Sequence, residues 1–71
     1  MGRKATMYLE LMGVTPGAYK VRDAVGKSHW LPRSITRLGG EIAEGTYPIH
    51  EFRIELWMVT RKRIKGIKDK T

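Results

Sequence analysis

The sequence predicts a small, mainly β (α+β) domain: four or five strands in a twisted antiparallel sheet, or in a small SH3- or OB-like barrel, closed by a C-terminal helix. Two observations lead to this prediction. Short segments of alternating apolar and polar residues are separated by turns that contain Gly or Pro, a pattern typical of antiparallel strands. A run that starts near residue 55 instead has an acidic residue first and basic residues last, which favours a helix.

The central stretch, residues 18–31, predicts a tight β-hairpin. Asp23 and Gly26 flank Ala24-Val25 in the order expected for a type I turn. Gly26 can then adopt the left-handed conformation of a three-residue loop with a bulge. The strand pairs of this register are Tyr19 with Leu31, Lys20 with Trp30, Val21 with His29, Arg22 with Ser28 and Asp23 with Lys27.

Alternation along these two strands divides their side chains between two faces. One face suits a core and carries Tyr19, Val21, His29 and Leu31. The other face is cationic with one aromatic ring and carries Lys20, Arg22, Ser28 and Trp30. A two-residue turn at Val25-Gly26 would instead pair Val21 with Trp30 and bury the tryptophan, because a one-residue shift inverts the faces. We favour the bulged register because a β-branched valine tolerates positive φ poorly.

Shorter patterns predict the remaining strands. Residues 6–14 alternate, and Thr15-Pro16-Gly17 meets the demands of a type II turn. Pro32 should end a strand or mark a sheet edge. Further strands are expected over 34–38 and 49–54, the second with Phe52 and Ile54 on one side, whereas the glycine-rich residues 39–45 should form a loop or a single helical turn.

Residues 55–66 could continue a strand or form a helix. Glu55 at the start, basic residues in the last turns and Gly66 just beyond them favour the helix, with Gly66 as its stop. We expect residues 1–71 to form one domain, with residues 1–5 and 67–71 flexible. A chain of 71 residues buries only ~60% of its unfolded surface, so self-association into a homo-oligomer would add useful buried area.

Positive charge is concentrated at the C-terminal end. The formal net charge is +7, and residues 60–71 contain six Lys or Arg against one acid, which places +5 there and +2 elsewhere. Such clustering favours binding to a polyanion, usually nucleic acid. A solvated basic tail that only keeps the protein soluble is the alternative interpretation.

The residues expected to contact DNA or RNA form two groups. Phosphates would bind the C-terminal group, which consists of Arg61, Lys62, Arg63, Lys65 and Lys68. Unpaired bases would stack on Trp30 beside Lys20 and Arg22, with Arg33 and Arg37 extending the surface. Ordinary packing of Trp30 over lysine methylenes is the alternative for the hairpin.

Several chemistries find no support in the sequence. There is no Cys, which excludes disulfides, zinc–thiolate sites and cysteine nucleophiles. His29 and His50 lack a third ligand at metal spacing, and Ser28 and His29, as neighbours in a strand, should point to opposite faces. We therefore expect no enzyme activity, no metal and no cofactor. No apolar run could span a membrane, so we expect a cytoplasmic protein without a membrane partner.

The segment Trp30-Leu31-Pro32-Arg33-Ser34, followed by a strand and by Trp57-Met58 at the start of a basic helix, resembles small uncharacterised phage and prophage proteins. These proteins carry a W-[LI]-P-[KR]-S segment and a later I-P-E-W-L stretch, and the resemblance spans residues 18–66. Here Glu55 and Leu56 stand where the second motif has Pro and Glu. The resemblance implies a viral origin, action in the host cytoplasm and no established activity.

Two functions from different classes fit these features. The first is a nucleic-acid-binding accessory protein of phage origin. The second is a protein-binding inhibitor or modulator of a host enzyme or defence complex, because small phage proteins often act in that way and a basic surface can mask a nucleic-acid partner.

Overall fold

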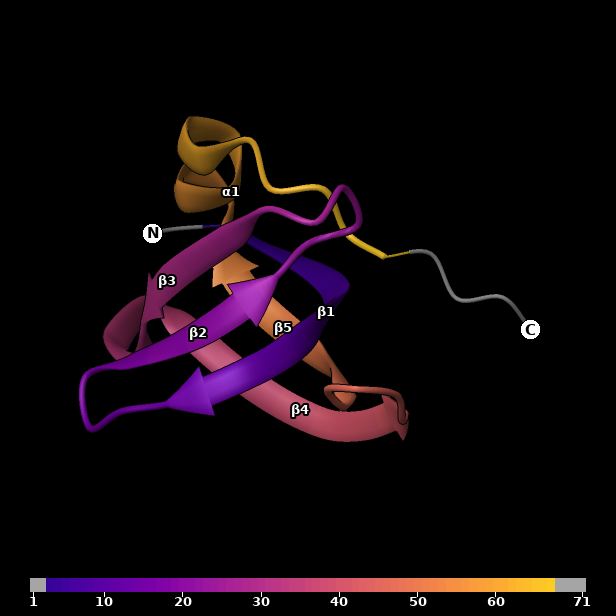
Figure 1. Cartoon of the computed structure of the whole chain (residues 1–71). Helices are drawn as coiled ribbons and strands as arrows, with labels where there is room; N and C mark the ends of the chain where they lie inside the picture. The colour runs from indigo at the N-terminus through magenta and orange to yellow at the C-terminus, as the bar shows by residue number, and fades with distance from the viewer. Residues whose placement is uncertain (1–2, 68–71) are drawn as a thin grey trace.

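The computed structural model describes residues 3–67, which form a five-stranded antiparallel sheet followed by one short helix (Figure 1). The strand order is β3-β2-β1-β5-β4. The elements are β1 (Lys4–Val14), β2 (Ala18–Arg22), β3 (Ser28–Pro32), a 3₁₀ turn (Arg33–Ile35), β4 (Thr36–Ala43), β5 (Ile49–Glu55) and α1 (Leu56–Lys62).

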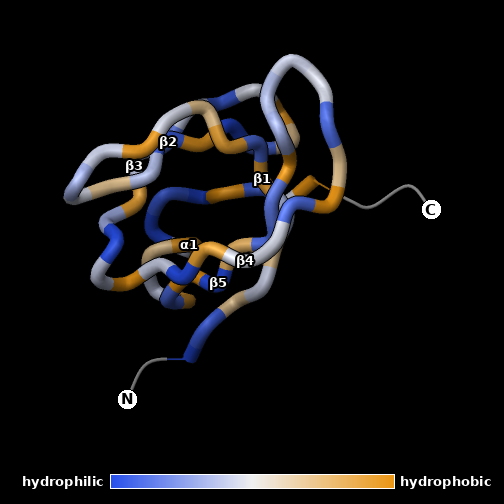
Figure 2. The backbone as a smooth tube through the Cα atoms, turned by 90° about the horizontal axis from the view of Figure 1, so that it is seen from below, coloured by the Kyte–Doolittle hydropathy of each residue, from blue (hydrophilic) through white to orange (hydrophobic). Residues whose placement is uncertain are grey.

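The sheet is curled but open. Its two edge strands, β3 and β4, are consecutive in the chain and are joined only by the three-residue 3₁₀ turn. So short a connection forces the sheet to bend until its edges approach each other, and seen from below the strands run around a common interior (Figure 2). Because β3 and β4 do not pair with each other in the described residues, the barrel alternative is wrong and the twisted-sheet prediction is confirmed.

The core fills the concave side of this sheet. Phe52, Leu9, Leu31, Ile54 and Val21 are completely buried. Met58 from α1 and Ile64 from the segment after it close the core, together with Tyr19, whose ring meets Phe52 edge-on with 6.0 Å between ring centroids. The prediction that Phe52 and Ile54 share a buried side is confirmed.

The hairpin between β2 and β3 has the bulged register. Lys20 lies opposite Trp30 and Val21 opposite His29. The Gly26 N–H donates to the Asp23 carbonyl at 3.0 Å, and Gly26 has a φ of 84°. Both predicted faces are present, because His29 is buried whereas Trp30 is 50% exposed. The alternative with a buried tryptophan is therefore wrong.

The first strand and its turn differ in detail from the prediction. β1 begins at Lys4 rather than at residue 6, so residues 4 and 5 belong to the sheet and not to a flexible end; residues 1–2 and 68–71 lie outside the described residues. The turn after β1 is where the sequence places it, but Gly17 does not have the positive φ of a type II turn. The Thr15 side chain closes the turn instead, since Oγ1 accepts a hydrogen bond from the Ala18 N–H at 2.9 Å.

The prediction of a loop over residues 39–45 is wrong for residues 39–43, which belong to strand β4, whereas residues 44–45 do lie in the connection to β5. The strand starts at Thr36, after the 3₁₀ turn rather than at residue 34, and continues to Ala43 with register shifts on both sides of Glu41. A Cβ on Gly39 would lie 3.1 Å from both the Cβ and the carbonyl oxygen of Glu51, so glycine allows a close approach to β5 here. All residues from Gly40 onward in this edge strand are exposed, and the sequence therefore shows no alternation there.

The helix α1 is confirmed, but its end is not at Gly66. Arg63 takes the left-handed conformation with φ 52°, its N–H donates to the Thr60 carbonyl, and the Ile64 N–H donates to the Val59 carbonyl. This is a Schellman motif, in which glycine usually holds the left-handed position. At the other end, the Leu56 N–H donates to the Arg3 carbonyl at 2.7 Å. None of the helices in the described part of the chain is long and apolar enough to span a membrane.

Candidate nucleic-acid interface

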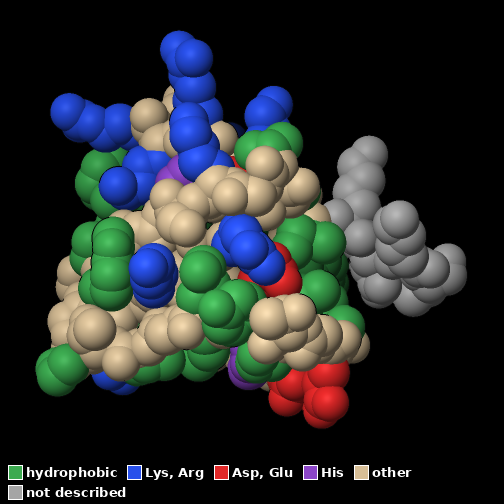
Figure 3. Space-filling view, in the orientation of Figure 1, with side chains coloured by type: hydrophobic (Ala, Val, Ile, Leu, Met, Phe, Trp, Pro, Cys, Tyr) green, Lys and Arg blue, Asp and Glu red, His purple; other side chains and the backbone are tan. Residues whose placement is uncertain are grey.

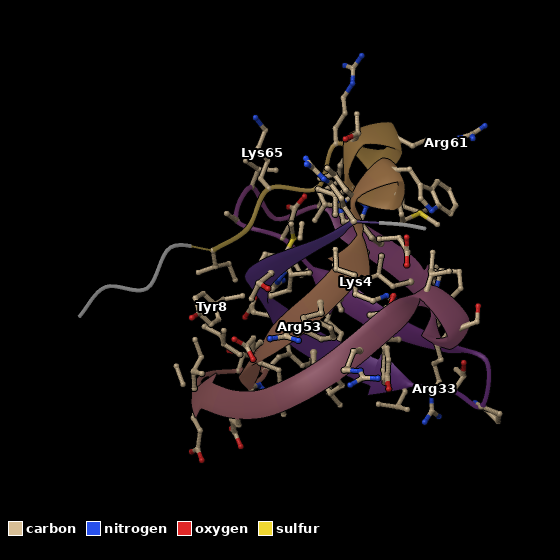
Figure 4. The ribbon with its side chains drawn as sticks, turned by 180° about the vertical axis from the view of Figure 1, so that it is seen from behind. Lys4, Tyr8, Arg33, Arg53, Arg61 and Lys65 are labelled. Carbon is tan, nitrogen blue, oxygen red and sulfur yellow. The ribbon has the colours of Figure 1, made fainter. Side chains whose placement is uncertain are left out.

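Four basic residues at the end of the described chain form what we call the cationic segment: Arg61, Lys62, Arg63 and Lys65. Arg61 and Lys62 belong to the last turn of α1, where positive charge is favourable to the helix dipole. Arg61, Arg63 and Lys65 are exposed. In Figure 4, Arg61 and Lys65 extend away from the body of the protein at the helix end of the molecule.

The backbone of the cationic segment is anchored to the fold. Ile64 is 6% exposed and belongs to the core. The Lys65 carbonyl accepts a hydrogen bond from the Ala24 N–H at 2.9 Å, and the Ile67 N–H donates to the Tyr8 carbonyl at 2.8 Å. Gly66 lies so close to β1 that a Cβ there would be 2.9 Å from the Met7 Cβ. These contacts show that residues 64–67 pack against the sheet and the hairpin loop rather than forming a loose tail.

Acidic residues do not neutralise the cationic segment within residues 3–67. The ion pairs of that part of the chain join Lys4 to Glu55, Arg22 to Glu10 and His29 to Asp23. Figure 3 shows Lys and Arg side chains gathered over the helix end, whereas the largest acidic cluster lies at the opposite end, over the β4–β5 connection. The surface is therefore electrostatically polarised, with the helix end positive.

Trp57 adds an aromatic side chain to this positive end. It is 51% exposed and sits four residues before Arg61, which places both on one face of α1. Trp57 is not among the residues that the sequence predicts to contact nucleic acid. Helical spacing gives no signal for this, because a helix that continued through Ile64 would place Trp57 on the face of Ile64; α1 instead ends at Lys62, and Met58 is its only buried residue.

The hairpin positions Lys20 and Trp30 together, as the register predicts. The Lys20 Nζ atom lies 5.6 Å from the Trp30 ring centroid, a cation–π distance. The ring is on the exposed face of edge strand β3. One aromatic platform with an adjacent cation is the arrangement that an unpaired base and its phosphate can use.

Arg22, on the same face, already has an acidic partner. Its Nε donates to the Glu10 Oε1 atom at 2.8 Å and its Nη2 to Oε2 at 3.4 Å. This hydrogen bonding, together with the negative charge of Glu10, raises the pKa of Arg22 above its ordinary value. The guanidinium also lies 5.5 Å from the Tyr47 ring centroid. Arg22 is thus the least available of the predicted phosphate contacts.

The other predicted contacts lie elsewhere. Arg33 stacks over the Tyr19 ring at 5.2 Å and is at the opposite end of the molecule from Arg61 and Lys65 (Figure 4). Arg37 is on edge strand β4, directly opposite Arg53. Lys68 lies outside the described residues. The structure therefore does not gather all the predicted residues into one surface.

A buried polar pair supports the loop that docks the cationic segment. Asp23 is 3% exposed and His29 is 7% exposed, with 2.8 Å between the Asp23 Oδ2 and His29 Nε2 atoms. The Asp23 Oδ1 atom accepts hydrogen bonds from the N–H groups of Val25 and Lys27. Burial acts to raise the pKa of Asp23, but hydrogen bonds from His29 and from the backbone of Lys27, Lys65 and Val25 outweigh it, so the pKa of Asp23 is lowered.

Comparison of the chain with protein-family models, with curated proteins and with solved structures found no match.

Proposed function

We propose that this protein is a non-catalytic accessory protein that binds nucleic acid through the cationic segment. The observation that carries the proposal is the combination of four basic residues on an anchored backbone with no ion-pair partner for them within residues 3–67. Exposed cations of this kind gain free energy by releasing counterions from a phosphate backbone. An anchored segment also loses less conformational entropy on binding than a loose tail would.

The two exposed tryptophans suit single-stranded or unpaired regions. Trp57 accompanies Arg61 on α1, and Trp30 accompanies Lys20 on the hairpin. Stacking of a base on an aromatic ring contributes about 1–3 kcal/mol with little sequence preference. The phage origin and the host cytoplasm as the place of action are parts of the same proposal and rest on the two sequence motifs alone.

The direct test is a gel-shift titration of the purified protein at about 50 mM salt, where phosphate contacts are strongest. Duplex DNA, single-stranded DNA and RNA of equal length should be compared. We expect a shift with at least one of them. No shift with any of the three would contradict the proposal.

One observation favours the second candidate, a protein-binding inhibitor. Leu56, Trp57 and Trp30 are 40%, 51% and 50% exposed, and both edge strands, β3 and β4, present unpaired backbone groups in the described residues. Exposed aromatics and open sheet edges are features of protein-binding surfaces. A pull-down from host lysate with and without nuclease separates the two functions, because partners held through nucleic acid are lost after nuclease treatment and directly bound proteins are retained.

Replacing Trp30 by Ala should weaken nucleic-acid binding more than it weakens the fold. The ring is half exposed, so its loss should cost about 1 kcal/mol of folding free energy or less, whereas loss of one stacked base should reduce affinity by about 1–3 kcal/mol. Fluorescence of a Trp57→Phe background isolates Trp30, whose emission should be quenched by acrylamide and altered by oligonucleotide. Unfolding of the Trp30→Ala protein would rule out the stacking role.

A further inference from the structure

The backbone groups of β3 alternate between its neighbour β2 and the free edge of the sheet. In the β2–β3 hairpin, the Asp23 N–H donates to the Lys27 carbonyl at 2.9 Å. At the other end of the same ladder, the Arg33 N–H donates to the Gly17 carbonyl at 3.0 Å. Because hydrogen-bonded and non-hydrogen-bonded pairs alternate along an antiparallel ladder, the odd-numbered residues of β3 bond to β2. The residues that direct their backbone groups toward the free edge are Ser28, Trp30 and Pro32.

These outward groups have no backbone partner within residues 3–67. In that part of the chain β3 pairs with β2 alone, and neither Ser28 nor Trp30 forms a backbone hydrogen bond with another segment. The position of Pro32 agrees with this assignment, because proline lacks an N–H and occurs in edge strands where that group would face solvent. β3 lies beyond β2 at the outside of the sheet (Figure 1). The edge can therefore take up one further strand through Ser28 and Trp30.

The other edge strand, β4, is less suited to pairing. Its register shifts on both sides of Glu41, and irregularities of this kind protect the sheet edges of natural proteins. The Thr36 N–H at its start already donates to the Arg33 carbonyl. β3 therefore offers the more regular edge.

Positive charge surrounds the β3 edge. Lys27 comes directly before the strand, Arg33 comes directly after it, and Lys20 lies beside its centre on β2. None of these three cations forms an ion pair within residues 3–67. The nearby carboxylates of Asp23 and Glu10 already have partners of their own. A segment with acidic side chains would therefore be attracted to this edge.

Trp30 shows what the side chains of an added strand would meet. Its ring is 50% exposed, and the Lys20 Nζ atom lies 5.6 Å from the ring centroid. The residue directly opposite Trp30 on an added strand would project to the same face of the sheet. That residue would contact an aromatic ring and a cation together, which suits the methylene stem and the carboxylate of a glutamate.

We propose that β3 binds an extended, acidic segment of another protein as an added strand. Ser28 and Trp30 would exchange N–H···O=C hydrogen bonds with the backbone of that segment, and acidic side chains at alternate positions would lie beside Trp30 and Lys20. A second copy of this chain suits the edge less well, because each chain has a formal net charge of +7 and the pairing would bring two cationic edges together. The site uses none of the residues of the cationic segment, so it does not depend on the proposed function.

The probe is a displayed library of random peptides about twelve residues long, enough for one strand and its flanks, selected against the full chain. We expect the selected peptides to contain Asp or Glu at alternate positions with β-branched residues between them. NMR titration with the most enriched peptide should shift the Ser28 and Trp30 amide signals. Amide hydrogen exchange at these two residues should be fast in the free protein and slow in the complex, whereas His29 and Leu31 should be protected in both.

Two substitutions at one position give a matched comparison. Ser28→Pro removes the outward N–H and should lower peptide affinity about ten-fold or more, yet it keeps the bonds between β2 and β3, which do not use that group. Ser28→Ala keeps the N–H and should bind as the unmodified protein does. Lys20→Gln should lower the affinity about two-fold to five-fold, whereas Arg61→Gln, in the cationic segment, should leave it nearly unchanged. N-methylation of alternate residues of the peptide tests the same bonds from the partner's side, without any change to the fold.

Equal peptide affinity of the Ser28→Pro and Ser28→Ala proteins would overturn the proposal, because the backbone of β3 would then not be used. So would a library that yields no binder, or amide protection of Trp30 in the free protein, which would mean that the edge is already covered. A dimer in analytical ultracentrifugation that Ser28→Pro dissociates would assign the edge to a second copy instead. Oligonucleotide affinity should be the same for both Ser28 variants, so the peptide experiment and the gel-shift experiment can fail independently.

Discussion

Changing Arg61, Lys62, Arg63 and Lys65 together to Gln should nearly abolish the salt dependence of nucleic-acid binding. If the protein makes about four to six phosphate contacts on duplex DNA, the logarithm of its affinity should fall against the logarithm of salt concentration with a slope of roughly −4 to −5. Removing four contacts should bring the slope to roughly −1. Fluorescence anisotropy at five or six salt concentrations measures both slopes.

The sheet should tolerate this quadruple change. Arg61, Arg63 and Lys65 are exposed, and the hydrogen bond that Lys65 makes to Ala24 uses its backbone carbonyl. Gln is nearly as good a helix former as Lys or Arg. Circular dichroism and the melting temperature should therefore be close to those of the unmodified protein.

A control variant separates a defined interface from net charge. Arg3, Lys27 and Arg53 are exposed and lie outside the cationic segment, so changing these three residues to Gln should leave the slope almost unchanged. If each charge removed lowers the slope equally in the cationic segment and in the control variant, the protein binds through its overall charge alone. Salt-independent affinity in the unmodified protein would instead favour the inhibitor function.

The hairpin was predictable because its determinants are local. Asp23 and Gly26 define the bulged turn within four residues, and alternation then decides that Trp30 is exposed and His29 buried. The start of α1 was predictable for a similar reason, since the charges at its two ends follow the helix dipole. In both places the local pattern and the tertiary packing favour the same conformation.

Long-range contacts account for what the sequence did not predict. Gly39 approaches Glu51 on β5, a contact between residues that are distant in the sequence. No local sequence pattern therefore indicates that Gly39 lies in a strand rather than in a loop. An arginine holds the left-handed position at the end of α1, where sequence rules look for glycine. Thr36 becomes an unpaired buried hydroxyl only when the edge strand folds against β5 opposite Ile54.

The sequence pattern does not pair Asp23 with His29, although it places both residues in the hairpin. The turn pattern alone explains Asp23, and the alternation of the strand alone explains His29. Alternation places Asp23 on the same face as Val21 and His29, and the diagonal across the two strands brings its carboxylate within 2.8 Å of the imidazole.

Changing Asp23 to Asn should give the largest loss of stability among the single substitutions considered for this protein. The carboxylate accepts hydrogen bonds from His29 and from the N–H groups of Val25 and Lys27 at a site that is 3% exposed. Weakening a buried, charge-assisted network of this kind should cost about 2–3 kcal/mol. That is a large share of the roughly 4–10 kcal/mol expected for a domain of this length. Urea denaturation at pH 7 measures the difference.

The pH dependence distinguishes the role of the carboxylate from a general packing defect. Because folding lowers the pKa of Asp23, the ionised form stabilises the native state, and this contribution is complete above the unfolded-state pKa of about 3.9. It is lost as the pH falls through the lower pKa of the folded protein. The stability gap between the unmodified protein and Asp23→Asn should therefore narrow as the solution is acidified below pH 4, whereas a packing defect would give a constant gap.

Glu10→Gln is the matched control, because it breaks the ion pair of Glu10 with Arg22, whose side chain is 35% exposed, and should cost about 1 kcal/mol or less of folding free energy.

The Asp23 substitution should also affect binding. Asp23 orders the loop that contains Ala24, and the Ala24 N–H donates a hydrogen bond to the Lys65 carbonyl. Loss of order in this loop would therefore release the cationic segment from its anchored position. At a temperature where Asp23→Asn is still folded, we expect weaker nucleic-acid binding with the salt slope unchanged, since every cation is still present. Equal stability of Asp23→Asn and Glu10→Gln would contradict this account.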